Sequence, residues 1–338
     1  MTVTIGRREL LAALGGAAAA WPLAARAQQP LKYRIAIVTP AFPVSEMKEG
    51  AGNPQYDAFF GELRRLGYVE GENLVAQRYS AEGKPERYGS LAEEVTRTKP
   101  DLIVAPFTQL VRVLKDATDT IPIVGIMADP TSYGVVNSLA RPGGNVTGVS
   151  VDAGLEIWAK RLQILREIIP TSTRVGFIGS RLTWDGPQGS VMTEAARQAG
   201  ISLLGPPIET PIREEGYRRA LEGMAVERVD GLIISDSSDN FTFRRLIVGL
   251  VEKARLPALY PYREYFSIGG LVTYGSDLSG VYRRVAGYAD RILRGKKPSE
   301  IPVYLESRFE LLVNLKAAKS LGVTIPTSLL VRADEVIE

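Results

Sequence analysis

The stretch Asp101–Asp129, DLIVAPFTQLVRVLKDATDTIPIVGIMAD, decides the fold. Residues 102–105 are a short run rich in branched apolar residues, which is typical of a strand buried on both faces of a parallel sheet. The hydroxyl of Thr108 can cap the next helix by accepting an N–H of its first turn. A second apolar run at 121–126 predicts a parallel strand. The stretch therefore reads as one right-handed β-α-β unit.

The same pattern returns in the second half of the chain. Three pairs of segments match: 34–38 with 174–178, 100–105 with 229–235, and 121–124 with 256–259. Tyr88 precedes Asp101 by 13 positions, and Tyr217 precedes Asp230 by the same 13. We interpret this as two similar α/β lobes with a cleft between them, although β-α-β segments also resemble one another through shared physics alone.

Composition excludes several kinds of chemistry. A chain of 338 residues can form two domains with full cores. Its 41 basic and 38 acidic residues are mixed along the chain without a basic block, so nucleic acid is not an expected partner. The chain has no His and no Cys, which removes the commonest general base, the commonest metal ligand and every thiol. We therefore expect no metal site and no cofactor, while an enzyme could still use Asp, Glu, Lys or Tyr.

The first 27 residues resemble an export signal. The pair Arg7-Arg8 precedes an Ala-rich apolar core at 10–23, and Ala25-Arg26-Ala27 has the small-x-small form of a cleavage site. The paired arginines resemble the twin-arginine class. The core is less apolar than a membrane-spanning helix of about 20 residues, so an uncleaved anchor is the weaker alternative. We expect cleavage near Ala27 and a mature protein in the periplasm.

Characteristic strings occur together along nearly the whole chain: LGYVEGENL (66–74), IPIV (121–124), LARPGGNVTGVS (139–150), LPALYPYREY (256–265), GGLVTYG (269–275) and RFELLVNLKAAKSLGVTIP (308–326). In this combination the sequence resembles the substrate-binding proteins of ABC importers in the TrpX-like (tryptophan/tyrosine-type) group. The resemblance implies an α/β fold with two Rossmann-like lobes, each with a parallel sheet, joined by crossover strands. This is the type I periplasmic binding protein fold.

The resemblance also implies a function without chemistry. Such a protein closes on a small organic solute, for which an aromatic amino acid and an aromatic acid are both candidates, and delivers it to an ABC transporter permease in the inner membrane. We expect a monomer. The expected first lobe holds residues 28–148 and about 276–300, and the second holds 149–275. Residues 301–338 form a third crossover and a C-terminal segment that the sequence does not assign to either lobe.

Ligands of such sheets bind beyond the carboxyl ends of the strands, so the strand tips are the candidate site. Ten residues are predicted to contact the solute: Phe42, Phe107, Thr108, Gln109 and Asp129 from the first lobe, and Trp184, Asp236, Ser237, Tyr262 and Tyr274 from the second. Aromatic rings suit an apolar or aromatic solute, and the start of a helix suits a carboxylate. Packing or capping within their own loops is the alternative role. The hinge is expected near 149–152, 272–277 and 308–313.

Two other classes of function remain open at this point. The same two-lobed fold serves as the sensing half of receptors and regulators, which would need a signalling or DNA-binding segment. An α/β enzyme using Asp or Tyr chemistry would need paired carboxylates in the cleft. No motif in the sequence favours either class.

Overall fold

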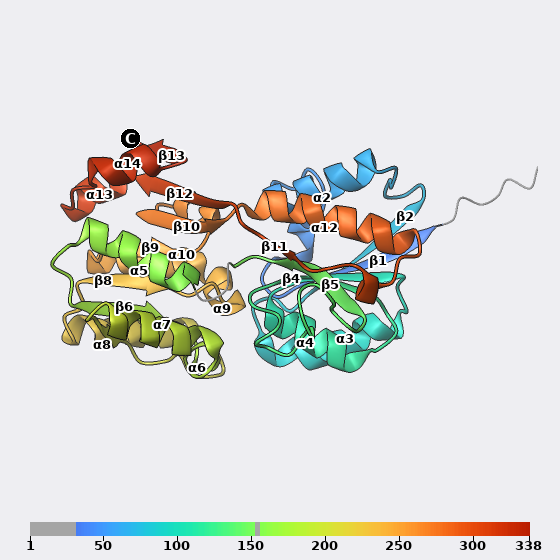
Figure 1. The fold of residues 1–338 in the computed structure, drawn as a ribbon, viewed down its shortest axis with the longest axis horizontal. Coiled ribbons are helices and arrows are strands. Elements are labelled where there is room, and N and C mark those ends of the chain that lie inside the picture. The colour runs from blue at the N-terminus through green and yellow to red at the C-terminus, as the bar shows by residue number, and fades with distance from the viewer. Residues whose placement is uncertain (1–31, 153–155) are drawn as a thin grey trace, which may run out of the picture.

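The computed structural model describes residues 32–152 and 156–338. The predicted export signal, 1–27, lies outside the described residues. Two separate sheets form two lobes side by side (Figure 1), one with six strands and one with seven. In the described parts of the chain, no helix combines the length and the apolar character needed to cross a membrane.

The first lobe is a parallel sheet with helices on both faces. Its strands are β1 (Tyr33–Thr39), β2 (Leu74–Ser80), β3 (Leu102–Pro106), β4 (Ile123–Met127), β5 (Val146–Ser150) and β11 (Tyr304–Leu305), in the order β11-β5-β4-β3-β1-β2. Helices α2 (Pro54–Arg65) and α12 (Leu278–Leu293) cover one face, and α3 (Tyr88–Arg97) and α4 (Thr108–Ala117) cover the other (Figure 1). Successive residues of β1 alternate between these layers: Ile35 and Ile37 pack toward α2, and Ala36 and Val38 toward α3.

The second lobe has the same plan, except that one strand runs antiparallel to its neighbour. Its strands are β6 (Arg174–Ile178), β7 (Ser202–Leu204), β8 (Gly231–Ile234), β9 (Ala258–Tyr260), β10 (Val272–Ser276), β12 (Phe309–Asn314) and β13 (Glu335–Ile337), in the order β13-β12-β10-β9-β8-β6-β7, and β12 is antiparallel to β10. Its longer helices are α5 (Glu156–Ile168), α7 (Pro187–Gln198), α8 (Glu214–Val226) and α10 (Arg244–Ala254). Short helices follow several strands: α6 (Arg181–Asp185), α9 (Ser238–Thr242) and α11 (Arg263–Phe266). Two more, α13 (Leu315–Leu321) and α14 (Thr327–Arg332), lie near the C-terminus.

The fold class predicted from the sequence is confirmed, and the repeat is visible in both sheets. The order β2-β1-β3-β4-β5 in the first corresponds to β7-β6-β8-β9-β10 in the second. The matched segments fall on β1 and β6, β3 and β8, and β4 and β9. The likeness extends to one hydrogen bond: Asp101 accepts the Arg34 backbone N–H at 2.7 Å, and Asp230 accepts the Arg174 backbone N–H at 2.9 Å.

The chain crosses between the lobes after β5, after β10 and between β11 and β12. Val149 and Ser150 pair with β4 in the first sheet, so the second lobe cannot begin at 149 as the sequence suggested. Strand β11 adds to the first sheet, whereas β12 and β13 belong to the second. Residues 301–338 are therefore divided between the sheets. The third crossing falls at 306–308. The hinge segment was expected at 308–313, but most of that range belongs to β12.

The matched aspartates give a test of the repeat. Asp230 also accepts the Thr173 backbone N–H at 2.8 Å, so it holds two amides where Asp101 holds one. We expect Asp101→Ala to lower the free energy of unfolding by about 1 kcal/mol and Asp230→Ala by about 2 kcal/mol, because each variant leaves backbone donors without their partner. Urea unfolding measures both. The exposed Asp119→Ala is the control, with a change within about 0.5 kcal/mol; equal losses in all three would contradict this account.

Candidate functional site

A cavity lies between the lobes, beyond the carboxyl ends of their strands. The space that the centres of water molecules can occupy in it is about 50 Å³. A single water needs about 10–15 Å³ by this measure, so the cavity in this conformation has room for about three to five water molecules. Its wall is built from the segments that follow β1, β3 and β4 in the first lobe and β6, β8 and β9 in the second.

Seven of the ten predicted site residues line this cavity: Phe42, Phe107, Thr108 and Gln109 from the first lobe, and Asp236, Ser237 and Tyr262 from the second. They come from loops far apart in the sequence. They meet because parallel strands end at the same edge of each sheet and the two edges face one another.

The other three predicted residues lie outside the cavity wall. Trp184 is on α6, where its ring packs edge-on against Phe177 with centroids 5.2 Å apart. Tyr274 packs beside Phe309, with centroids 5.8 Å apart, because β10 and β12 pair antiparallel. Asp129 accepts the Ser132 backbone N–H at 3.2 Å, so its carboxylate closes a local turn. Asp129 has the local capping role that was the alternative in the sequence analysis, whereas Trp184 and Tyr274 pack against rings of neighbouring strands.

Aromatic rings from both lobes surround one residue that the sequence analysis did not select, Phe241. Its ring centroid lies 5.5 Å from that of Phe42, 5.9 Å from that of Phe107 and 5.9 Å from that of Tyr262. Phe241 is on the short helix α9, directly after the tip of β8. Phe243 is both the C-cap residue of α9 and the N-cap residue of α10, so the chain bends between the two helices. The rings give the cavity an apolar floor.

The start of α4 differs from the prediction in its capping. Phe107 is the N-cap residue, with φ at 67°, and no side chain caps this helix. The Thr108 hydroxyl instead bonds to Ala128, donating to its carbonyl and accepting from its N–H, both at 2.8 Å. The amides of the first turn and the positive end of the helix dipole therefore remain available beside the cavity.

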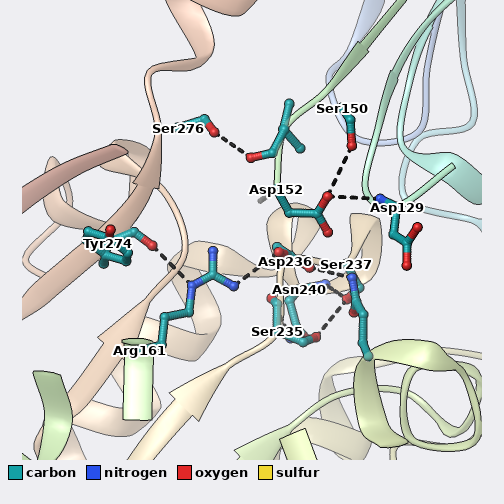
Figure 2. A network of polar contacts seen from close by, with 12 residues as sticks. Asp129, Ser150, Asp152, Arg161, Ser235, Asp236, Ser237, Asn240, Tyr274 and Ser276 are labelled. Carbon is teal, nitrogen blue, oxygen red and sulfur yellow. Dashed lines mark hydrogen bonds and ion pairs between the residues drawn. The ribbon is translucent and has the colours of Figure 1, made fainter. Parts of the chain in front are cut away.

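The second lobe contributes a buried ion pair, shown in Figure 2. Arg161 on α5 donates to Asp236 at 3.1 Å and to the Tyr274 carbonyl at 3.1 Å, and its guanidinium lies 4.6 Å from the Trp158 ring centroid. Gln188 donates to the other oxygen of Asp236 at 2.6 Å. Arg161 and Asp236 are 1% and 5% exposed, so solvent does not screen the pair.

This geometry agrees with comparisons to known proteins. A tyrosine-binding protein of Clostridioides difficile (strain R20291) is 24% identical over 265 residues, which are 78% of this chain and 75% of that protein. A conserved domain protein of Vibrio cholerae has the same fold, with a TM-score of 0.79 and 24% identity over 90% of this chain and 99% of that one. An ABC domain from Streptococcus pneumonia in complex with L-Trp has a TM-score of 0.77 and 21% identity over 90% and 100%.

The pattern of one family, the ABC transporter substrate binding proteins, matches residues 49–337. The chain belongs to this family. The resemblance found in the sequence is thereby confirmed at the level of the family. In this substrate-binding protein, residues 32–152 and 156–338 hold no cluster of three His, Cys, Asp or Glu side chains that could bind a metal ion.

A second carboxylate of the substrate-binding protein, Asp152, lies near the ion pair, on the first crossing between the lobes (Figure 2). It accepts the Asp129 backbone N–H at 2.9 Å and the Ser150 hydroxyl at 3.2 Å. Burial raises the pKa of Asp152 to about 6, and the charge of Asp236 contributes to that rise. Beside it, the Ser276 hydroxyl donates to the Val151 carbonyl at 2.5 Å, which joins the first two crossings.

The site therefore has an uneven charge. When ionised, Asp152 and Asp236 place two negative charges close to Arg161, which pairs with Asp236. A further cation, Arg244, lies over the cavity rings, with its guanidinium 5.4 Å from the Phe42 centroid and 4.8 Å from the Phe241 centroid. A buried charge without a partner is costly. A cationic group bound in the cavity would remove that cost.

We expect Asp152→Asn to stabilise the solute-free protein at neutral pH. A folded-state pKa raised above the ordinary value means that the folded protein holds this proton more tightly, so stability falls as pH rises from about 4 to about 6. Asn keeps the accepting oxygen and removes the charge. The variant should be more stable at pH 7.5 by about 1–3 kcal/mol and equal to the wild type below about pH 4.

Urea unfolding across this pH range measures the difference. Asp185→Asn is the matched control, because its carboxylate is 64% exposed and should give an offset that does not change with pH. A constant offset for Asp152→Asn would contradict the assignment.

Proposed function

We propose that this chain is the solute-binding component of an ABC importer. It is exported, its signal is removed near Ala27, and it works in the periplasm as a monomer that delivers solute to an inner-membrane permease. The family supports this role, and so does a cavity between two lobes that the chain crosses three times.

The solute is a small molecule with an ammonium group and an aromatic or apolar body. The proposal depends on two neighbouring carboxylates, Asp152 and Asp236, of which only Asp236 pairs with Arg161. The negative charge left over favours a cation within reach of the cavity. The rings around Phe241 suit the body of the solute. The uncapped start of α4 can accept a carboxylate. An aromatic amino acid has all three features, and two similar proteins are described as tyrosine-binding or as a complex with L-Trp.

Binding acts through closure. Phe42, Phe107, Thr108 and Gln109 belong to one lobe and Asp236, Ser237 and Tyr262 to the other, so a solute touches both sets only when the lobes are together. A solute that contacts both lobes favours the closed state by its difference in affinity between the two states. The hinge lies in the crossings near 149–152, 272–277 and 306–308. The solute leaves unchanged.

Thermal shift and calorimetry with four probes test the solute class. We expect L-Trp or L-Tyr to stabilise the protein in proportion to RT ln(1 + [L]/Kd). Indole-3-propionate, which lacks the ammonium group, should bind at least about tenfold more weakly, as should tryptamine, which lacks the carboxylate. Asp152→Asn should weaken L-Trp binding by about tenfold and leave indole-3-propionate nearly unchanged.

Equal binding of L-Trp and indole-3-propionate would contradict the ammonium site. A new product formed from any bound probe would contradict the absence of chemistry. Mass spectrometry of the probe after incubation with the protein detects that product.

A further inference from the structure

The two lobes touch at a glycine on the rim of the cavity. Gly83 follows β2 in the first lobe, and Thr242 ends α9 in the second. A Cβ placed on Gly83 would lie 2.5 Å from the Thr242 methyl carbon and 3.7 Å from the Thr242 Cβ. The first distance is too short for any side chain, so the lobes can approach this closely only because residue 83 has none.

Neither side of this contact can easily yield. The Gly83 N–H donates to the Pro40 carbonyl at 2.7 Å, and Ala81 and Lys84 add backbone bonds of 2.9 and 3.0 Å that fix the same loop. The Thr242 hydroxyl donates to the Ser238 carbonyl at 2.9 Å. That bond, with the stiff χ1 of a β-branched residue, holds the methyl group toward Gly83.

The contact bears directly on the cavity wall. Helix α9, which ends at Thr242, carries Ser238 and Phe241, and both line the cavity. Beside the contact, the Tyr88 hydroxyl of the first lobe lies 3.1 Å from the Ser238 hydroxyl, with both residues buried. The distance at which Gly83 meets Thr242 therefore sets how near Phe241 comes to Phe42 and Phe107.

We propose that the contact of Gly83 with Thr242 is the stop that sets how far the lobes close. Both are positioning residues, since neither lines the cavity. The proposal rests on the proposed function in that the solute is held between the lobes. A larger residue at 83 stops the lobes early and leaves the aromatic wall apart, so the closed state loses population and the apparent Kd rises.

Calorimetry with L-Trp as the probe tests the stop with a matched pair of alanines. Gly83 and Gly50 have nearly the same φ, 75° and 74°, but no atom lies within 4 Å of a Cβ on Gly50. Both alanine variants carry the same backbone strain, and only Gly83→Ala meets Thr242. We expect Gly83→Ala to raise the Kd by about tenfold or more, and Gly50→Ala to leave it within about twofold.

A second substitution separates the steric effect from damage to the fold. Thr242→Ser removes the opposing methyl group and keeps the hydroxyl that bonds to Ser238. Gly83→Ala combined with Thr242→Ser should recover most of the lost affinity while keeping the thermal stability of Gly83→Ala alone. Equal Kd values for Gly83→Ala and Gly50→Ala, or no recovery in the double variant, would overturn the proposal.

A disulfide tests the contact without any solute. The 3.7 Å separation of the two Cβ positions lies within the range of a disulfide, about 3.5–4.5 Å, and the chain has no other thiol. The double variant Gly83→Cys and Thr242→Cys should cross-link under mild oxidation in solute-free protein and become more compact by small-angle scattering. Failure to cross-link would overturn the proposal. If wild-type protein ignores L-Trp but the variant cross-links, the solute class is wrong and the stop stands.

Discussion

The buried pair of Arg161 with Asp236 is the interaction on which the second half of the site depends. Arg161 lies on the first helix after the chain enters the second lobe, and its other bond reaches the Tyr274 carbonyl shortly before the chain leaves it. One guanidinium thus links α5 and β10 to the tip of β8. Taking two charges out of water is costly, and such a pair persists only when its remaining polar atoms are also bonded. Gln188, the Tyr274 carbonyl and the Trp158 ring meet that condition here. The position of Asp236 at the cavity is therefore fixed by Arg161, which does not line the cavity, and by Gln188, which does.

The buried charge of Asp152 lowers the stability of the folded, solute-free protein at neutral pH. Asp152 lies on the crossing strand, almost fully buried, and the charge of Asp236 reinforces the effect of that burial on its pKa. Asn would keep the oxygen that accepts from the Asp129 N–H and the Ser150 hydroxyl without the buried charge. Electrostatic strain of this kind is typical of functional sites, where a bound group relieves it. Asp152 is on a crossing and Asp236 is on a lobe. Under the proposed function, a solute cation that relieves the strain on these two carboxylates also favours closure of the lobes.

The sequence predicted most strongly what depends on local pattern. Apolar runs that start after Asp101 and Asp230 marked the central strands, and residues just beyond strand ends, such as Phe107 and Asp236, did reach the cavity. Prediction failed where a contact joins distant parts of the chain. Arg161 resembled any charged residue on an amphipathic helix, since its partner lies 75 positions away. Tyr274 followed the strand-end rule, but the antiparallel pairing of β10 with β12 directs it to Phe309. Trp184 and Phe241 depended on short helices, too brief to give a periodic signal.

The two lobes share a strand order but bring different chemistry to the cavity. The first supplies the uncapped start of α4 and the rings of Phe42 and Phe107; the second supplies the ion pair of Asp236 and the ring of Phe241. The equivalent place in the second lobe, after β8, is closed by Ser237, whose hydroxyl accepts the Asn240 N–H and so satisfies the start of α9. Two identical lobes would present two similar surfaces to the cavity, and a solute could bind to either one. Under the proposed function, each lobe holds only part of what a zwitterion requires, so tight binding of that solute requires that the lobes come together.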